Sequence, residues 1–177
     1  KMFTDAEILA NPYLHKTNSS CLHSIGKNVF RLNSVLEHGL LSYSRFRQID
    51  PSFQRNFDGG NSDKWISVVP TAQSIGDTGA AKEFLQHGIV FLFDKTDLYY
   101  PDKRVTSSYA RSYGLPYTKN AGYSDERYAF DYIPKEKIIG IKLDKELASK
   151  DLATLEHYVY DSFKYELFEK NVRSYLD

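Results

Sequence analysis

The stretch YSDERYAFDYIPKEKIIGIKL, residues 123–143, carries the clearest structural pattern in this chain. The acidic pair Asp125-Glu126 opens a predicted strand from Glu126 to Ile133. The chain then turns at IPKEK and resumes as a strand from Ile138 to Leu143. Much earlier, the run CLHSI at residues 21–25 predicts another strand, with His23 inside it. A polar residue on an early strand and a glutamate at the mouth of a late strand are typical of a cleft between two sheets, so this pair indicates an enzyme.

The composition is that of an ordinary globular domain. The chain has 177 residues, of which 41% are hydrophobic and 26% are charged, so we expect residues 1–177 to form a single domain with a sizeable core. Basic and acidic residues both number 23, and this balance excludes a protein that binds nucleic acid mainly through a basic excess. Cys21 is the only cysteine in the sequence, which excludes an internal disulfide and a cysteine-based zinc cluster, and we expect it to be buried.

Apolar spacing and capping residues predict the order of the elements. Helices are expected at Asp5–Leu9, at 28–38 with Gly39 as the C-cap, at 80–87, and in a C-terminal segment at about 151–176. Strands are expected at 21–25, 65–69, 89–93, 126–133 and 138–143. The polar runs at 17–20, 42–60 and 98–122 are expected to be loops, the second with one helical turn. Because the order lacks regular βαβ alternation, it predicts an α+β fold with two packed sheets.

His23 is the first candidate site residue. By strand alternation it shares a face with Cys21 and Ile25, where a histidine can simply be a satisfied core residue. In a cleft, a neutral imidazole would instead hydrogen-bond a ribose hydroxyl and hold a nucleotide. Both interpretations are compatible with the sequence.

Glu126 is the second candidate. A carboxylate at the mouth of a strand can stabilise a developing oxocarbenium ion, as in glycosyl transfer. An exposed acid paired with Arg127 is the alternative interpretation. Since side chains alternate along a strand, we expect only one of Asp125 and Glu126 to face the cleft.

Hydroxyl, cationic and aromatic side chains supplement these two candidates. Ser67 and Thr71 begin a small hydroxyl cluster at the end of the strand at 65–69, where they would contact a ligand or serve as ordinary turn residues. Arg104 and Arg111 lie among tyrosines in the segment before Glu126. Cations beside aromatic rings can bind pyrophosphate and stack on a base, and a solvated loop is the alternative. The tyrosines are Tyr109, Tyr113, Tyr117 and Tyr123.

Taken in order, these motifs resemble an ADP-ribosyltransferase domain over about residues 20–143. The resemblance depends on the strand around His23, the phrase SVLEHGLL at residues 34–41, the strand WISVVP at residues 65–70, the strand at 89–93, and Glu126 followed by IPKEKIIGI. It implies a split fold with two small sheets flanking a cleft for NAD. It also implies that His23 holds the NAD ribose, that the backbone at Ser24 clamps the nicotinamide amide, and that Glu126 is catalytic and bonds the 2′-hydroxyl of the nicotinamide ribose.

The resemblance places the remaining candidates as well, with some departures from the family pattern. Ser67 and Thr71 would occupy the middle motif, and Arg104, Arg111, Tyr123 and Asp125 would bind phosphate or the acceptor. The His-Tyr-Glu class of the family has a glycine where this chain has Ser24. That class also stacks nicotinamide on a tyrosine after the middle strand, and because none occurs between Trp65 and Tyr99, Tyr109 or Tyr113 would take that role.

The sequence therefore predicts an NAD-dependent mono-ADP-ribosyltransferase that modifies a macromolecular acceptor, protein rather than nucleic acid, and releases nicotinamide. Effector and toxin domains have this activity, and relatives of this family that modify DNA or RNA share the scaffold. Ser124 stands where arginine-modifying relatives have a second acid, which disfavours arginine as the acceptor. NAD is the expected co-substrate, with no metal and no membrane. We expect a soluble protein from a reducing environment, or a secreted effector acting in a target cytoplasm.

Two alternatives remain open at this stage. The first is a non-catalytic binding module on the same scaffold. The second is an RNA 2′-phosphotransferase-like enzyme, in which arginines would converge with His23 on a phosphate. The arginines considered for that role are Arg31, Arg45 and Arg47.

Overall fold

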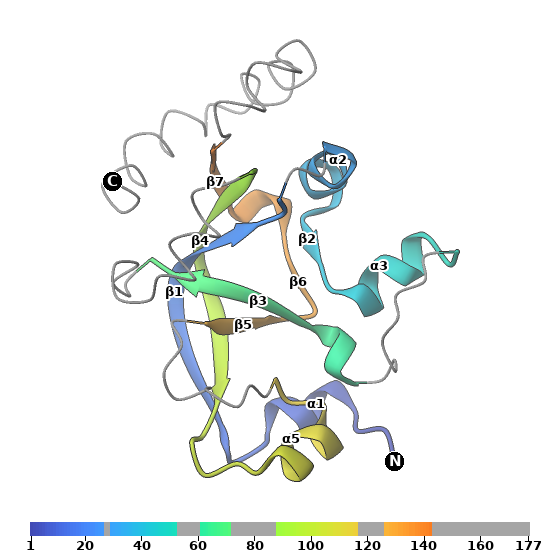
Figure 1. The fold of residues 1–177 in the computed structure, drawn as a ribbon, viewed down its shortest axis with the longest axis vertical. Helices are drawn as coiled ribbons and strands as arrows, with labels where there is room; N and C mark the ends of the chain where they lie inside the picture. The colour runs from blue at the N-terminus through green and yellow to red at the C-terminus, as the bar shows by residue number, and fades with distance from the viewer. Residues whose placement is uncertain (27–28, 53–60, 72–87, 117–125, 143–177) are drawn as a thin grey trace.

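The computed structural model describes residues 1–26, 29–52, 61–71, 88–116 and 126–142 (Figure 1). Its helices are α1 (Asp5–Leu9), α2 (Val29–His38), α3 (Tyr43–Ile49) and α5 (Ser107–Tyr113), with 3-10 turns η1 (Asn61–Lys64) and η2 (Lys135–Lys137). Its strands are β1 (Leu14–Ser24), β2 (Leu40–Leu41), β3 (Trp65–Pro70), β4 (Val90–Pro101), β5 (Arg127–Phe130), β6 (Tyr132–Ile133) and β7 (Ile138–Lys142). The described residues thus form a mixed fold of α-helices and antiparallel sheets, as the sequence predicts at that level.

The larger sheet has the strand order β1-β3-β5-β4-β7, and β1 also pairs with β4. Strands β1, β3, β5 and β4 therefore form a closed sheet, in which each strand pairs with the next and β4 pairs back with β1. Strand β7 pairs with one end of β4. The longest ladder joins β1 to β4, from Leu14↔Pro101 to Ser24↔Val90, and Figure 1 shows these two strands running side by side. The smaller sheet pairs β2 with β6, beside α3.

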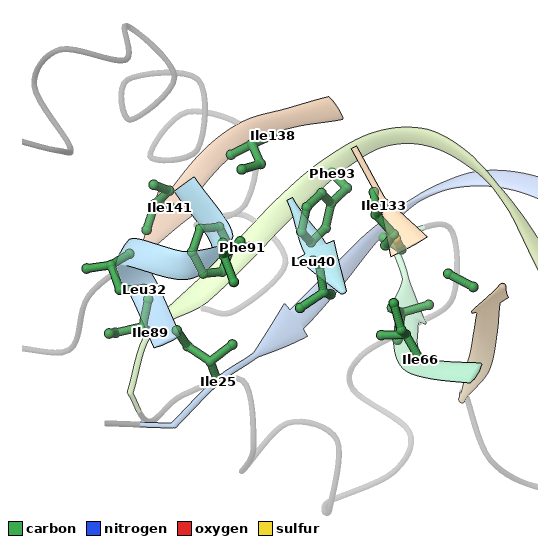
Figure 2. Close-up of a cluster of buried hydrophobic side chains, with 14 of the residues drawn as sticks. Ile25, Leu32, Leu40, Ile66, Ile89, Phe91, Phe93, Ile133, Ile138 and Ile141 are labelled. Atoms are coloured by element: carbon green, nitrogen blue, oxygen red, sulfur yellow. The ribbon is translucent and has the colours of Figure 1, made fainter. Parts of the chain in front are cut away.

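The main hydrophobic core lies between the β1-β4-β7 part of the sheet and the layer made by α2, β2 and β6 (Figure 2). Phe91 and Phe93 on β4 project toward Leu32 of α2 and Leu40 of β2 (Figure 2), and all four side chains are fully buried. Cys21 belongs to this core, and burial raises the pKa of its thiol to about 12, so the prediction of a buried cysteine is confirmed. A second cluster joins α1 and α5 to Trp65 at the opposite end of the sheet.

Local sequence signals set several element boundaries. Thr4 and Glu7 form a capping box that begins α1, because each side chain bonds to the other residue's backbone N–H. Gly39 ends α2 with φ +84, and a Cβ there would lie 2.3 Å from the carbonyl oxygen of Ile133. Position 39 therefore requires glycine, both for its positive φ and for the lack of space for a Cβ. This close contact places the end of α2 against the start of η2.

The predicted strand at 126–133 is divided into two. Asp131 has φ +67 between β5 and β6, a conformation that Asp adopts more readily than most side chains. Its N–H donates to the carbonyl of Lys64, its carbonyl accepts from the N–H of Ser42, and its carboxylate accepts from Arg45 at 2.6 Å. These contacts turn the chain from the larger sheet into the smaller one.

Three predicted loops contain regular structure. The polar run at 17–20 lies inside β1, because it pairs with Thr96–Leu98 of β4. The segment after residue 97 continues β4 to Pro101 and then forms α5, which Thr106 caps. Residues 43–49 form α3, which Ser42 caps, where a single turn was expected. In each case pairing or packing with a distant segment overrides a weak local pattern.

The predicted helices at 80–87 and 151–176 lie outside the described residues. Among the described residues, no helix is long and apolar enough to cross a membrane.

Candidate functional site

A cavity of about 400 Å³ lies where β1 and β3 separate, a size within the usual range of small-ligand sites. The β1–β3 ladder ends at Leu22↔Val69, and beyond it the two strands diverge toward the α2 and α3 side (Figure 1). Residues just past this last pair line the cavity from both strands. The lining residues are His23, Ser24, Arg31, Leu41, Ser42, Tyr43, Trp65, Ile66, Ser67, Pro116 and Tyr128.

The imidazole of His23 bridges the gap between the diverging strands. Its Nδ1 lies 2.6 Å from the backbone carbonyl of Ser67. Since a carbonyl can only accept, Nδ1 carries the proton and donates this hydrogen bond. The residue as a whole is half-buried, but Nε2 is buried and has no hydrogen-bond partner among the described residues.

His23 is neutral at physiological pH. Its pKa is lowered from 6.5 to about 4. Burial is the main cause, the hydrogen bond to Ser67 opposes the shift, and the positive charge of Arg31 adds to it. In this tautomer Nε2 is a lone-pair acceptor. A ligand that supplies an O–H or N–H donor would satisfy it, and a buried acceptor left unpaired costs about 1–3 kcal/mol.

The opening of the sheet lets residues from both of its faces meet. By alternation His23 belongs with Cys21 and Ile25, which point into the main core, whereas Ser67 pairs with Tyr128 on the opposite face. Just beyond the last pair of the β1–β3 ladder, the His23 ring lies between the two strands and donates a hydrogen bond to the carbonyl of Ser67. The histidine thus reaches the same cavity as the phenol of Tyr128.

Glu126 adjoins this cavity through Tyr128. It lies immediately before β5, two residues from Tyr128 and therefore on the same face of the strand. Burial raises the pKa of Tyr128, and the nearby Glu126 carboxylate, as an acceptor for the phenol and as a negative charge, raises it further. Tyr128 lines the cavity, whereas Glu126 is not among the described lining residues.

The register gives the spacing of the two principal candidates. In the β3–β5 register Val68 pairs with Arg127, so Glu126 lies opposite Val69. In the β1–β3 register Val69 pairs with Leu22, which directly precedes His23. Their backbones are therefore two strand spacings apart, on the order of 10 Å. A ligand of nucleotide size can span that separation.

Ser24 and Ser67 both line the cavity, whereas Thr71 does not. Thr71 follows β3 at its other end, where its N–H and hydroxyl both donate to the carbonyl of Ser20. These bonds close the end of β3 onto β1, which is a structural role.

Tyr109 and Tyr113 lie on α5 and pack against the N-terminal segment. Tyr113 stacks on Phe3 at 4.2 Å between ring centroids, and the Tyr109 hydroxyl exchanges hydrogen bonds with the buried side chain of Asn11. Neither tyrosine is brought to the cavity. Among the described residues, the aromatic rings that line it belong to Tyr43, Trp65 and Tyr128.

Arg104 and Arg111 also lie away from the cavity. The Arg104 guanidinium is bound to Asp102, with Nε 2.9 Å from Oδ1, and Arg111 is exposed on α5. Tyr123 and Asp125 lie outside the described residues. Of the three arginines considered for a phosphotransferase, Arg31 lines the cavity, while Arg45 is paired with Asp131 and Arg47 with Asp63.

Sequence reasoning did not select Tyr43, Trp65 or Tyr128 as lining residues. Tyr128 had a usable signal, because it follows Glu126 by two positions on a predicted strand and must share its face. Tyr43 and Trp65 had none, since each is brought to the cavity by pairing between distant segments. Among the described residues, no group of His, Cys, Asp or Glu is arranged to hold a metal ion.

No protein-family model matches this chain, and a comparison with curated proteins finds no similar sequence. The functional argument therefore depends on the geometry of the cavity and on the residues around it.

Proposed function

We propose that this protein is an NAD-dependent mono-ADP-ribosyltransferase whose substrate binds in the cavity between β1, β3 and β5. The observation that carries the proposal is one cavity lined by both His23 and Tyr128. The Nε2 atom of the neutral His23 imidazole has no hydrogen-bond partner among the described residues, and the pKa of Tyr128 is raised by burial and by the neighbouring Glu126 carboxylate. A ribose hydroxyl is a donor that suits the Nε2 acceptor of His23. The three aromatic rings of the described lining residues supply surfaces on which nicotinamide or adenine can stack.

The proposed reaction begins with cleavage of the bond between C1′ of the ribose and the nicotinamide nitrogen. Nicotinamide leaves with the bonding electron pair, and positive charge develops on C1′ and the ring oxygen. The carboxylate of Glu126 stabilises this charge and accepts a hydrogen bond from the ribose 2′-hydroxyl. A nucleophile of the acceptor then forms the new bond to C1′ and gives up its proton, while water in its place yields ADP-ribose.

In this mechanism Tyr128 holds the Glu126 carboxylate in the absence of substrate. Its hydroxyl and a ribose 2′-hydroxyl are chemically similar donors, so the carboxylate would exchange one for the other, or accept both, when NAD binds. The protonated Nδ1 of His23 keeps the ring oriented through Ser67.

The test is release of nicotinamide from NAD, measured by chromatography, for the wild-type chain and for Glu126→Gln. We expect the variant to keep its melting temperature and to lose turnover by about 100-fold or more, the size expected for one transition-state contact. The matched control is Glu136→Gln, the same substitution at an exposed position on η2, which should leave turnover unchanged.

Two results would refute the proposal. One is a wild-type chain that neither releases nicotinamide nor gains thermal stability from NAD, which would favour a non-catalytic binding module. The other is a Glu126→Gln variant that turns over as fast as the wild type, which would remove Glu126 from the mechanism.

A further inference from the structure

Large apolar side chains that are exposed to solvent form two sets among the described residues. Met2, Leu9 and Tyr13 belong to the N-terminal segment around α1, whereas Ile49 and Tyr132 lie on α3 and β6. The exposed fraction is 49% for Ile49 and 41% for Tyr132. The second set adjoins the cavity, as the strand register and the lining residues show.

Tyr132 adjoins the cavity through its strand partner. In the β2–β6 sheet it pairs with Leu41, and paired residues of antiparallel strands carry their side chains on the same face. Leu41 lines the cavity, and so do the next two residues, Ser42 and Tyr43, of which Tyr43 begins α3. Tyr132 is therefore a direct neighbour of a lining residue, on the α3 side of the cavity.

Arg45 joins Tyr132 to Ile49. Its guanidinium carbon lies 4.4 Å from the centre of the Tyr132 ring, and its Nη2 lies 2.6 Å from the carboxylate of Asp131. Ile49 follows Arg45 by four positions on α3, which places the two side chains next to each other on the helix surface. Arg45, Ile49 and Tyr132 thus form one continuous surface, which we call the α3–β6 patch.

The patch is ordered before any partner binds. The contact with the Tyr132 ring and the ion pair with Asp131 hold the Arg45 side chain on both sides. The backbone of Asp131 is fixed in turn by hydrogen bonds to Lys64 and Ser42. Side chains that are already ordered lose little conformational entropy on association. Tyr and Arg are also enriched among the few residues that dominate the binding energy of protein interfaces.

The charges of the patch favour a protein partner over a nucleic acid. Arg45 is paired with Asp131, and Arg47, also on α3, is paired with Asp63. Binding to a nucleic acid depends on cations that neutralise phosphates, and these two guanidinium groups are already neutralised by aspartates of the same chain. A patch of aromatic and aliphatic side chains without net charge instead complements an apolar surface of another protein.

We propose that the α3–β6 patch docks the protein acceptor of the transferase, an assignment that rests on the function proposed above. A nucleophile of the acceptor has to enter the cavity to reach C1′ of the ribose, so the acceptor surface around that nucleophile contacts the rim of the cavity. The patch lies on this rim, and apolar side chains of the acceptor pack on Tyr132 and Ile49.

The test measures two products of one reaction. The chain is incubated with biotin-labelled NAD and unfractionated extracts of bacterial and of animal cells, in separate reactions, and nicotinamide release and protein-bound label are both quantified. For Tyr132→Ser and for Ile49→Asp we expect protein labelling to fall about 10-fold or more, the effect of losing one central interface residue. Nicotinamide release without extract should stay at the wild-type rate, because neither residue lines the cavity.

Tyr13→Ser is the matched control. Tyr13 has a similar exposed fraction, 40%, and its ring packs edge-on against Tyr109 of α5 instead of belonging to the patch. Its protein labelling should equal that of the wild type. Tyr132→Phe should keep most of the labelling, because it retains the aromatic ring. Melting temperatures show whether each variant is folded, and Ile49→Asp, at the exposed end of α3, tests the same patch if Tyr132→Ser does not fold.

The outcomes separate the docking surface from the proposed reaction. Protein labelling at the wild-type level by folded Tyr132→Ser or Ile49→Asp would overturn the docking surface, as would wild-type label that appears in nucleic acid instead of protein. A wild type that releases nicotinamide but labels no protein in either extract would retain the NAD reaction and lose the docking surface. A chain that releases no nicotinamide would lose the transferase, and the acceptor surface with it.

Discussion

Replacing His23 by asparagine should remove a specific pH dependence from the stability of this protein. Asparagine is neutral at every pH, and its side-chain N–H₂ can still donate to the carbonyl of Ser67. In the native protein burial holds the pKa of His23 at about 4, against 6.5 for an ordinary histidine. The unfolded chain therefore takes up a proton at higher pH than the folded chain does, and protonation favours unfolding.

The sign and size follow from this difference. A lowered histidine pKa means that stability is greatest above about pH 6.5 and falls as the pH drops toward 4. Through His23 alone, the wild type should lose about 2 kcal/mol between about pH 7.5 and about pH 5, and about 3 kcal/mol by about pH 4. His23→Asn should lack this contribution, so the difference in unfolding free energy between the two proteins should change by those amounts.

The assay is urea denaturation of both proteins at several pH values, with equal m-values as the check that both unfold in the same way. Subtracting one curve from the other cancels every other titrating group that the two proteins share. A difference independent of pH would mean that the imidazole is solvated. A difference of opposite sign would mean that His23 is protonated and paired with a carboxylate. Either result would refute the neutral acceptor on which the proposed ligand binding depends.

Two further predictions concern the scaffold. Gly39→Ala should cost several kcal/mol, because the new Cβ would overlap the carbonyl of Ile133 at a φ of +84. Gly26 has φ +65, and no atom of the described residues lies within 4 Å of the position its Cβ would take, so Gly26→Ala should cost only the ~1–2 kcal/mol of the left-handed conformation. Equal losses measured by chemical denaturation would contradict the close approach of α2 to η2. Phe91→Ala should destabilise the protein by about 3–5 kcal/mol, since this ring is fully buried in the main core. A loss below about 1 kcal/mol would show that the Phe91 site is not packed as described.

The candidate site was partly predictable. His23, Ser24 and Ser67 were selected from the sequence and line one cavity, because each lies on a strand whose apolar pattern is visible without the fold. Thr71, Tyr109 and Tyr113 were selected by the same kind of reasoning and lie elsewhere. Composition near a strand end does not tell which way the chain turns next, and the α5 tyrosines turn toward α1.

The sequence by itself determined what local interactions control. The amphipathic face of α2, the glycine that ends it, and the buried strand β3 follow from side-chain spacing and backbone preference within a few residues. Only the tertiary structure decided the length of β1 and β4, since the polar residues of β1 are strand only because β4 pairs with them. It also decided the closure of four strands into a circuit and the opening of the β1–β3 ladder, where His23, Arg31 and Tyr128 meet. Backbone pairing between segments far apart in the chain leaves no pattern in the local sequence. The point at which such pairing ends, where the cavity lies, therefore cannot be located from the sequence.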